Sequence, residues 1–293
     1  MGAADVVPGV SGGTIAFITG IYEELLKSIK SVDLEALKLF FTFRLKEFWI
    51  KINANFLLAV LIGIGISVVS LSRVMTYLLE YHPIYIWSFF FGLIIASALL
   101  VAKEVKKWDV FSIISLIIGA IIAYTITVMT PAETPSSWWF IILSGAIAIC
   151  AMILPGISGS FILLLMGKYK YIMTAISDFN LEIICLFALG ASVGIISFSH
   201  LLTFLLKRYH NLTISLLTGF MLGSLNKVWP WKETLETYID RHGVEKALIE
   251  GNISPFTFSE QFNTDALLIQ AIIMAVFGFF LIYGIEKFAS KQK

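Results

Sequence analysis

Charged residues and cysteines are both scarce in this sequence of 293 residues. Asp, Glu, Lys and Arg together make up 14% of the chain, whereas 58% of it is hydrophobic. A soluble domain needs a more charged surface to remain in water, so this composition excludes an ordinary soluble fold. Cys150 and Cys185 both lie in apolar runs, which argues against a disulfide framework and against a zinc site.

An excess of charge of one sign is lacking as well, because the formal net charge is only +1 at pH 7. A basic surface of the kind that holds nucleic acid is therefore not indicated. No motif for a cofactor or a metal is present, and we expect the protein to carry neither. The sequence carries no prediction of the oligomeric state. Its surroundings should be membrane lipids.

What the sequence does have is a series of long apolar runs. A helix rises about 1.5 Å per residue, so roughly 20 apolar residues cross the hydrocarbon core. We expect helices, because the open edges of a sheet cannot be satisfied in lipid. The predicted fold class is an all-α polytopic membrane protein with spans at 56–79, 84–102, 110–129, 183–206, 212–228 and 266–285.

Two further apolar segments, 3–26 and 138–173, are interrupted by proline, glycine and serine, and they resemble each other. An ungapped alignment of residues 8–22 with residues 155–169 matches seven of fifteen positions. The matching cores are Pro8-Gly9-Val10-Ser11-Gly12-Gly13, hereafter motif one, and Pro155-Gly156-Ile157-Ser158-Gly159-Ser160, hereafter motif two. We interpret both segments as broken or re-entrant helical hairpins.

The repetition continues beyond the motifs. Residues 63–97 and 190–224 share nine identities in 35 positions, most of them small or polar. An odd number of crossings separates the two copies, so their orientations are opposite, as in the inverted repeats of secondary transporters. The alternative is that two unrelated apolar stretches match by chance.

The predicted organisation is therefore two inverted repeats, each a broken hairpin plus three transmembrane helices. The first repeat covers residues 1–130, with its motif at 3–26, an interfacial helix at 28–50 and spans 56–79, 84–102 and 110–129. The second covers residues 138–293, with its motif at 138–173, spans 183–206, 212–228 and 266–285, and an outer loop at 230–263. An apolar arm precedes motif two but not motif one, so we expect the natural protein to begin upstream or this half to lack its first arm.

Loop charges predict the orientation. Fourteen of the 21 Lys and Arg residues lie in the loops and tail on one side, which the positive-inside rule assigns to the cytoplasm together with the C-terminus. Motif one then opens to the cytoplasm and motif two to the outside.

Both motifs predict a site for an anion. Proline ends the helical ladder, and the half-helix that follows presents free N–H groups and a positive dipole end at membrane depth. Such groups, with nearby hydroxyls, bind phosphate. The candidate binding residues are Gly9, Ser11, Gly12, Gly13 and Thr14 in the first copy and Gly156, Ser158, Gly159 and Ser160 in the second. The alternative is that these small residues only let helices pack closely.

Ionisable residues near the motifs provide further candidates. Arg73 and His200 occupy equivalent repeat positions and could hold phosphate oxygens, although Arg73 could equally snorkel to head groups and His200 could be a packing residue. Carboxylates flank motif one and are candidates for coupling to a proton or sodium ion, with plain exposure as the alternative: Asp5, Glu23 and Glu24. Outside, Lys168 and Lys170 are candidates for capturing an anion, or they simply lie among head groups.

A serine protease is the alternative to transport. Both motifs fit the Gly-x-Ser-Gly string of rhomboid proteases, and His200 could pair with Ser158. A protease needs one dyad, however, and here the serine motif occurs twice with different partner positions. We therefore expect no catalytic residue and no enzyme activity.

The signatures resemble a known family. The stretches that carry the resemblance are Gly2-Ala3-Ala4-Asp5-Val6-Val7-Pro8-Gly9-Val10-Ser11-Gly12-Gly13-Thr14, Gly20-Ile21-Tyr22-Glu23-Glu24 and Leu154-Pro155-Gly156-Ile157-Ser158-Gly159-Ser160. They are similar to the polyprenyl-phosphate (undecaprenyl-phosphate) transporter family of PopT-type translocases, formerly a family of unknown function. The resemblance implies a protein of the bacterial cytoplasmic membrane that returns undecaprenyl phosphate from the outer to the inner leaflet for reuse in envelope synthesis. The chain departs from the family in lacking the first arm and in carrying Lys168 and Lys170.

The residues fit such a substrate. A phosphate monoester carries about −1.5 to −2 charges at neutral pH, whereas the polyprenyl tail can remain in lipid. The protein then has to shield only the head group, and alternating access of the two motifs is the expected mechanism. A secondary transporter of a small soluble anion is the alternative, and a lateral opening from the motifs to lipid would distinguish the two.

Overall fold

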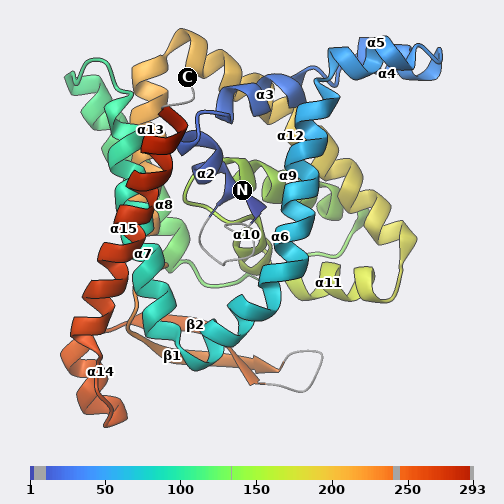
Figure 1. Cartoon of the computed structure of the whole chain (residues 1–293). Coiled ribbons are helices and arrows are strands. Elements are labelled where there is room, and N and C mark those ends of the chain that lie inside the picture. Colours follow the sequence, from blue (N-terminus) through green and yellow to red (C-terminus); the bar gives the residue numbers. More distant parts are fainter. Residues whose placement is uncertain (3–10, 133, 240–244, 291–293) are drawn as a thin grey trace.

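The computed structural model describes residues 1–2, 11–132, 134–239 and 245–290, and within these ranges the chain is mostly helical (Figure 1). The elements of the first half are α2 (Gly12–Ile18), α3 (Tyr22–Lys30), α4 (Leu34–Phe41), α5 (Leu45–Lys51), α6 (Ala54–Tyr81), α7 (Pro83–Lys103) and α8 (Val110–Val128). Those of the second half are α9 (Trp138–Ile153), α10 (Gly159–Leu165), α11 (Tyr169–Ser177), α12 (Leu181–Arg208), α13 (His210–Ser224), β1 (Lys232–Ile239), β2 (Glu245–Asn252), α14 (Pro255–Phe262) and α15 (Leu268–Ser290).

Helices α6, α7, α8, α12 and α15 are long and apolar enough to cross a membrane. The prediction of an all-α polytopic membrane protein is therefore confirmed. The span predicted at 212–228 forms the shorter helix α13, whose 15 residues extend about 22 Å. Much of α13 is buried, and it packs against α8 and α7.

Glycines set the distances within the principal helix pairs, which are α7 with α15, α8 with α13 and α9 with α12. A Cβ atom added at Gly92 of α7 would lie 1.8 Å from the carbonyl oxygen of Ala275 on α15. The corresponding distance from Gly190 of α12 to the carbonyl oxygen of Ile142 on α9 is 1.9 Å. Because lipid supplies no hydrophobic force between helices, such close backbone contact is a principal source of their association.

The close contacts of α7 with α15 recur between α13 and α8. In the first pair, added Cβ atoms at Gly92 and Gly278 would meet the carbonyl oxygens of Ala275 and Phe89. In the second pair, those at Gly219 and Gly119 would meet the carbonyl oxygens of Leu116 and Leu216. One sequence offset relates Gly92 to Gly219 and Phe89 to Leu216, and a second relates Leu116 to Ala275 and Gly119 to Gly278. In each pair a helix of the first half contacts a helix of the second half, and the two sequence offsets convert one pair into the other, so the two contacts are equivalent.

Helices α6 and α12 differ in one respect. Gly190 on α12 is covered by α9, whereas an added Cβ atom at the aligned Gly63 on α6 would meet no atom within 4 Å. Gly63 is exposed, and so are many of the described residues around it on α6.

The segment 138–173 turns back on itself. Residues leading into α9 bind the far end of α10: the N–H of Ala132 donates to the carbonyl oxygen of Leu165 at 2.8 Å, and the Thr134 hydroxyl donates to that of Met166. The chain therefore enters through α9, reverses at motif two and returns through α10 to the end from which it came. Figure 1 shows α2, α9 and α10 in the middle of the molecule, with the longer helices around them.

The prediction of one interfacial helix at 28–50 is wrong, because this stretch contains the end of α3 followed by α4 and α5. Asp33 starts a new helix by accepting a hydrogen bond from the N–H of Ala36 at 2.8 Å. The backbone at Phe43, with a φ of 58°, then interrupts the helical path between α4 and α5. The two short helices extend away from the bundle in Figure 1, and Leu34 and Phe43 are each 85% exposed, as expected of residues in a lipid interface.

The predicted outer loop at 230–263 contains an antiparallel hairpin of β1 and β2 followed by α14. Two indole groups tie it to the chain around it: Trp229 Nε1 donates to the carbonyl oxygen of Ile253 at 2.8 Å, and Trp231 Nε1 donates to that of Ala266 at 2.9 Å. The hairpin lies at the end of the bundle opposite to α3, α4 and α5 (Figure 1).

A matched pair of substitutions tests the glycine contacts. Gly190→Ala forces α12 away from α9 and should lower the stability by about 1–3 kcal/mol, as overpacking does. Gly63→Ala meets open space and should be neutral or raise the stability by up to about 1 kcal/mol. The measurement is the thermal unfolding midpoint of the purified protein in detergent. Equal midpoints for the two variants would contradict this packing.

Candidate functional site

The described part of motif one, residues 11–13, forms the start of α2, and Ser11 is its N-terminal cap. The Ser11 hydroxyl accepts a hydrogen bond from the N–H of Gly13 at 3.1 Å and donates one to the carbonyl oxygen of Met152 on α9 at 2.8 Å. Ser11 and Thr14 are each only 1% exposed. One side chain therefore caps α2 and joins it to the end of α9.

The two broken segments touch at this point. A Cβ atom added at Gly13 would lie 2.4 Å from the carbonyl oxygen of Ile153, so the two backbones are in direct contact. Tyr22, at the start of α3, donates its hydroxyl proton to the same carbonyl oxygen at 3.3 Å. One residue, Leu154, separates Ile153 from the start of motif two. Motif one thus packs against the helix end that leads directly into motif two.

Motif two lies against α13. Gly156 has a φ of +89°, a conformation that favours glycine, and its added Cβ atom would lie 2.9 Å from the Ser224 hydroxyl oxygen. The hydroxyls of Ser158 and Ser160 bond to each other at 2.8 Å, and the Ser160 side chain is exposed. A Cβ atom at Gly159 would meet the Ala148 carbonyl oxygen at 2.6 Å. Glycines in motif two therefore serve close packing, whereas its serines are paired with each other.

The first amide groups of α2 already have partners. The N–H of Gly13 donates to the Ser11 hydroxyl, and the N–H of Thr14 donates to the Ser11 carbonyl oxygen at 3.0 Å. An anion at motif one would have to take the place of Ser11, so the predicted cradle is closed in this conformation. Gly9 and Asp5, which we also predicted at this site, lie outside the described residues.

Arg73 and His200 lie on the long helices α6 and α12 and are both exposed. The imidazole Nδ1 of His200 is 2.9 Å from the carbonyl oxygen of Ile196 on its own helix. Among the residues that the structure describes, Ser158 pairs with Ser160 and not with His200, so the serine–histidine dyad of a protease is not formed.

Glu23 and Glu24 lie at a cavity of about 480 Å³, whose wall also includes Lys27, Glu104 and His210. Glu23 pairs with Lys27 at 3.1 Å, and Glu24 accepts a hydrogen bond from Asn53 at 2.9 Å. The cavity gathers ionisable groups beside the start of α3, which is where the sequence predicted the coupling carboxylates.

Lys168 is buried between α10 and α11. Its ammonium group donates to the carbonyl oxygen of Thr134 at 2.7 Å and to the Ser136 hydroxyl at 3.0 Å. These bonds hold the loop before α9 to the end of α10, so the group is engaged within the protein. Lys170 and Lys168 line a cavity of about 810 Å³ at the same end.

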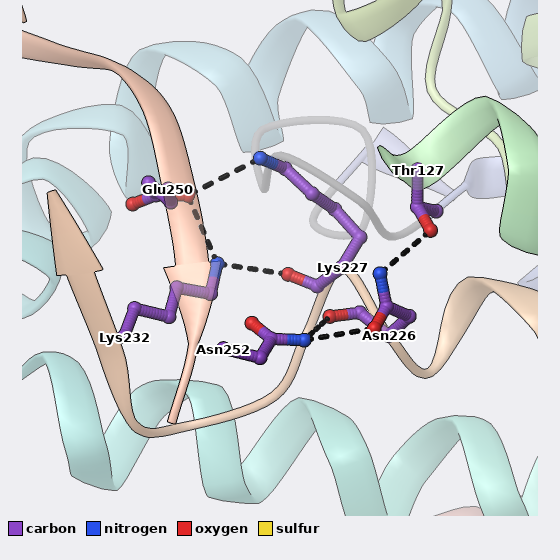
Figure 2. Close-up of polar contacts among 6 residues, drawn as sticks. All are labelled: Thr127, Asn226, Lys227, Lys232, Glu250 and Asn252. Carbon is purple, nitrogen blue, oxygen red and sulfur yellow. Dashed lines mark hydrogen bonds and ion pairs between the residues drawn. The ribbon is translucent and has the colours of Figure 1, made fainter. Parts of the chain in front are cut away.

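A cluster of charges beneath the hairpin was not predicted from the sequence. Figure 2 shows Lys227 and Lys232 converging on Glu250, whose Oε2 atom lies 3.2 and 3.1 Å from their ammonium nitrogens. The side chain of Lys232 is only 9% exposed, and its ammonium group also donates to the carbonyl oxygen of Lys227 at 2.9 Å. Glu250 lies 18 residues from Lys232 and 23 from Lys227, and the three meet only because the hairpin folds back. The β-prone residues of β1, Thr234, Thr237, Tyr238 and Ile239, are the signal in the sequence that could have indicated a strand here.

Burial changes the titration of this cluster. Loss of solvent lowers the pKa of Lys232 to about 8, although the charge of Glu250 opposes the change. For Glu250, burial alone would raise the pKa, but Lys232 and Lys227 outweigh it and lower the pKa. The cluster is therefore an ion triad in which burial makes Lys232 release its proton at a lower pH than an ordinary lysine does.

Amide side chains join the same region to α8. Asn252 on β2 donates to the carbonyl oxygen of Asn226 at 2.7 Å and to its side-chain oxygen at 2.9 Å, and Asn226 donates to the Thr127 hydroxyl at 2.8 Å (Figure 2). These bonds attach the hairpin to the bundle without using the lysines.

Comparison with known proteins gives consistent matches. A family model described as undecaprenyl phosphate translocase-like matches residues 1–246. A Vibrio cholerae protein named polyprenyl-phosphate transporter is 46% identical over 291 residues, covering 99% of this chain and 94% of that protein. A Staphylococcus aureus protein of the same name is 35% identical over 248 residues, covering 78% of this chain and 83% of that protein. Both relatives are named as transporters, which agrees with the prediction that the chain is not an enzyme, and no solved structure matches it.

The depressed pKa of Lys232 has a consequence for stability. Between about pH 8 and 10.5 an unfolded lysine still binds its proton while Lys232 in the folded protein has released it, so this group favours folding increasingly as the pH rises. Lys232→Met removes that contribution. The unfolding midpoint of the wild type, relative to the variant, should therefore rise across this range in a thermal scan at stepped pH. A difference that stays constant with pH would contradict the burial of a titrating Lys232 beside Lys227 and Glu250.

Proposed function

This chain belongs to the undecaprenyl phosphate translocase-like family, and we propose that it carries polyprenyl phosphate from the outer to the inner leaflet of the bacterial cytoplasmic membrane. The protein would lie with its C-terminus and the helices α3, α4 and α5 on the cytoplasmic side, and with the hairpin outside. The loop charges support this orientation.

The contact between the broken segments is the observation that carries the proposal. Ser11 and Gly13 of one segment rest on the Met152 and Ile153 carbonyl groups of the other. Backbone that is not helical is tolerated at membrane depth only inside protein or beside a cavity, and transporters place their substrates at such breaks. When this contact opens, the Ser11 hydroxyl and the N–H of Gly13 become available to a phosphate group.

Two inverted repeats would allow this site to open to either side of the membrane. The matched glycine contacts of α7 with α15 and of α13 with α8 support two equivalent halves. In an inverted arrangement, rocking of one half against the other exposes the shared site to each side in turn. We propose that motif two with Ser158 and Ser160 receives the head group outside, and that motif one releases it inside.

An apolar cavity at the contact of the two broken segments favours a lipid over a soluble anion. Gly13 and Met152, at the contact of the two segments, are part of the wall of a cavity of about 430 Å³. Its other walls are apolar side chains of α3, α6, α9 and α12, among them Leu25, Ile29, Leu57, Val60, Ile64, Ile149 and Ile195. A soluble anion has no use for such a wall, whereas an isoprenoid chain attached to a bound phosphate does.

Coupling to an ion would use the opposite, polar cavity. Glu23 and Glu24 there could exchange a proton or a sodium ion with the cytoplasm as the head group leaves. His210 lies in the same wall, and its Nδ1 atom is buried without a hydrogen-bond partner among the described residues.

Reconstitution tests the proposal. Vesicles that contain the wild-type protein should move a fluorescent polyprenyl phosphate between leaflets, measured by its loss of accessibility to a membrane-impermeant quencher. The triple variant Ser11→Ala, Ser158→Ala and Arg73→Ala should transport at least about 10-fold more slowly, since hydrogen bonds to a charged group are each worth about 1.5–3 kcal/mol.

Ser70→Ala is the matched control, because the Ser70 hydroxyl is exposed on α6 and bonds only within its helix. Normal transport by the triple variant would remove the site assignment. A wild type that moves a small soluble anion but no polyprenyl phosphate would replace the proposed function by its alternative.

A further inference from the structure

We propose that Lys227 and Lys232 form a binding site for a phosphate monoester at the hairpin end of the bundle, next to motif two. The inference rests on the proposed function and adds to it the place where the head group is first held. It assigns to these lysines the role that the sequence suggested for Lys168 and Lys170.

An unmatched positive charge is the first argument. Two ammonium groups share a single carboxylate oxygen, Oε2 of Glu250, at 3.1 and 3.2 Å. Among the described residues around this cluster's cavity, Glu250 is the acidic residue and Lys227 and Lys232 are the basic ones. One positive charge therefore remains to be neutralised, and a phosphate oxygen is a suitable partner.

Free donors are the second argument. An ammonium group has three N–H donors. Toward the residues that the structure describes, Lys232 uses two of them, on Glu250 and on the carbonyl oxygen of Lys227, while Lys227 uses one on Glu250. Aromatic faces hold both groups in position: Lys232 lies 4.3 Å from the ring centroid of Trp87, and Lys227 lies 4.8 Å from that of Phe161. The remaining donors are thus fixed in place before a ligand arrives.

The cavity beside the lysines is the third argument. It has a volume of about 420 Å³, within the range of ligand pockets. Its wall combines the end of α8, the hairpin and α10, and Phe161 of α10 directly follows Ser160 of motif two. Polar groups from Thr127, Asn226 and Asn252 are also part of the wall. A phosphate held by the lysines would therefore be adjacent to the half-helix that begins at motif two.

A purely structural role would be the simpler explanation, in which the ion triad fastens the hairpin. The hairpin is already fastened by Trp229, Trp231 and the Asn252–Asn226–Thr127 bonds. One lysine would suffice to pair with Glu250, so a fastening role leaves the second ammonium group unexplained. The two roles also predict opposite effects of removing the carboxylate, which makes them separable.

The test is equilibrium binding to the purified full chain in detergent, followed by the fluorescence of the tryptophans near the cluster. The probes are farnesyl phosphate, inorganic phosphate and farnesol. The wild type should bind farnesyl phosphate. Inorganic phosphate should compete with farnesyl phosphate for the lysines, whereas farnesol should not compete. Lys227→Gln and Lys232→Gln should each weaken the binding of farnesyl phosphate about 10-fold, whereas Lys232→Arg should retain most of it. Glu250→Gln should strengthen binding, because the carboxylate competes with the ligand.

Lys46→Gln is the matched control, since Lys46 is exposed on α5 at the other end of the molecule and its loss removes the same charge. Lysine variants that bind farnesyl phosphate as the wild type does would overturn the inference, and so would a Glu250→Gln protein that binds as weakly as they do. Inorganic phosphate that fails to compete would overturn it as well.

The inference and the proposed function can fail separately. If the lysine variants bind normally while the wild type moves polyprenyl phosphate in vesicles, the site falls and the function stands. If the lysine variants weaken the binding of farnesyl phosphate as expected but the wild type does not move polyprenyl phosphate in vesicles, the site stands and the transport function falls.

Discussion

The structure depends on the contact between two interrupted helices in the interior of an apolar bundle. Backbone groups freed by Pro-Gly breaks have no water to bond with in a membrane, so each break must be satisfied by protein. Ser11 meets this need, because its hydroxyl caps α2 and also binds the Met152 carbonyl group at the end of α9. Gly13 is required beside it, since any side chain there would collide with Ile153. The residues that permit the contact are therefore also those that a phosphate group could use.

The surrounding helices make that contact possible. Close glycine packing joins α7 to α15, α13 to α8 and α12 to α9. The equivalence of the first two of these contacts supports two related halves around the broken segments. The polar and charged residues then fall into separate regions: carboxylates and His210 in the cavity beside α3, and the Lys227–Lys232–Glu250 cluster beneath the hairpin. An apolar cavity borders the contact at Gly13 and Met152. Such an arrangement suits a molecule with a charged head and an apolar tail.

Sequence reasoning succeeded where one local property decides the structure. Length and apolarity were enough to predict α6, α7, α8, α12 and α15, and proline with glycine located the breaks near α2 and α10. It failed where a helix cap or a turn interrupts an apolar stretch, and where residues distant in sequence meet. The helix predicted at 28–50 is divided by the cap at Asp33 and the turn at Phe43, and the hairpin was taken for a loop. Because Lys232 and Glu250 meet only through that hairpin, the charge cluster could not be predicted without it, and the engagement of Ser11 with Met152 has no signature in sequence.

A reversible cross-link tests most directly whether the two broken segments must separate during transport. Ser11→Cys and Met152→Cys, in a chain with Cys150→Ser and Cys185→Ser, would be joined by a short thiol-cleavable linker in vesicles. Our account predicts that the linked protein does not move polyprenyl phosphate between leaflets and that reduction returns transport to the rate of the same cysteine variant before linking. Transport at the unlinked rate while the segments are joined would contradict it.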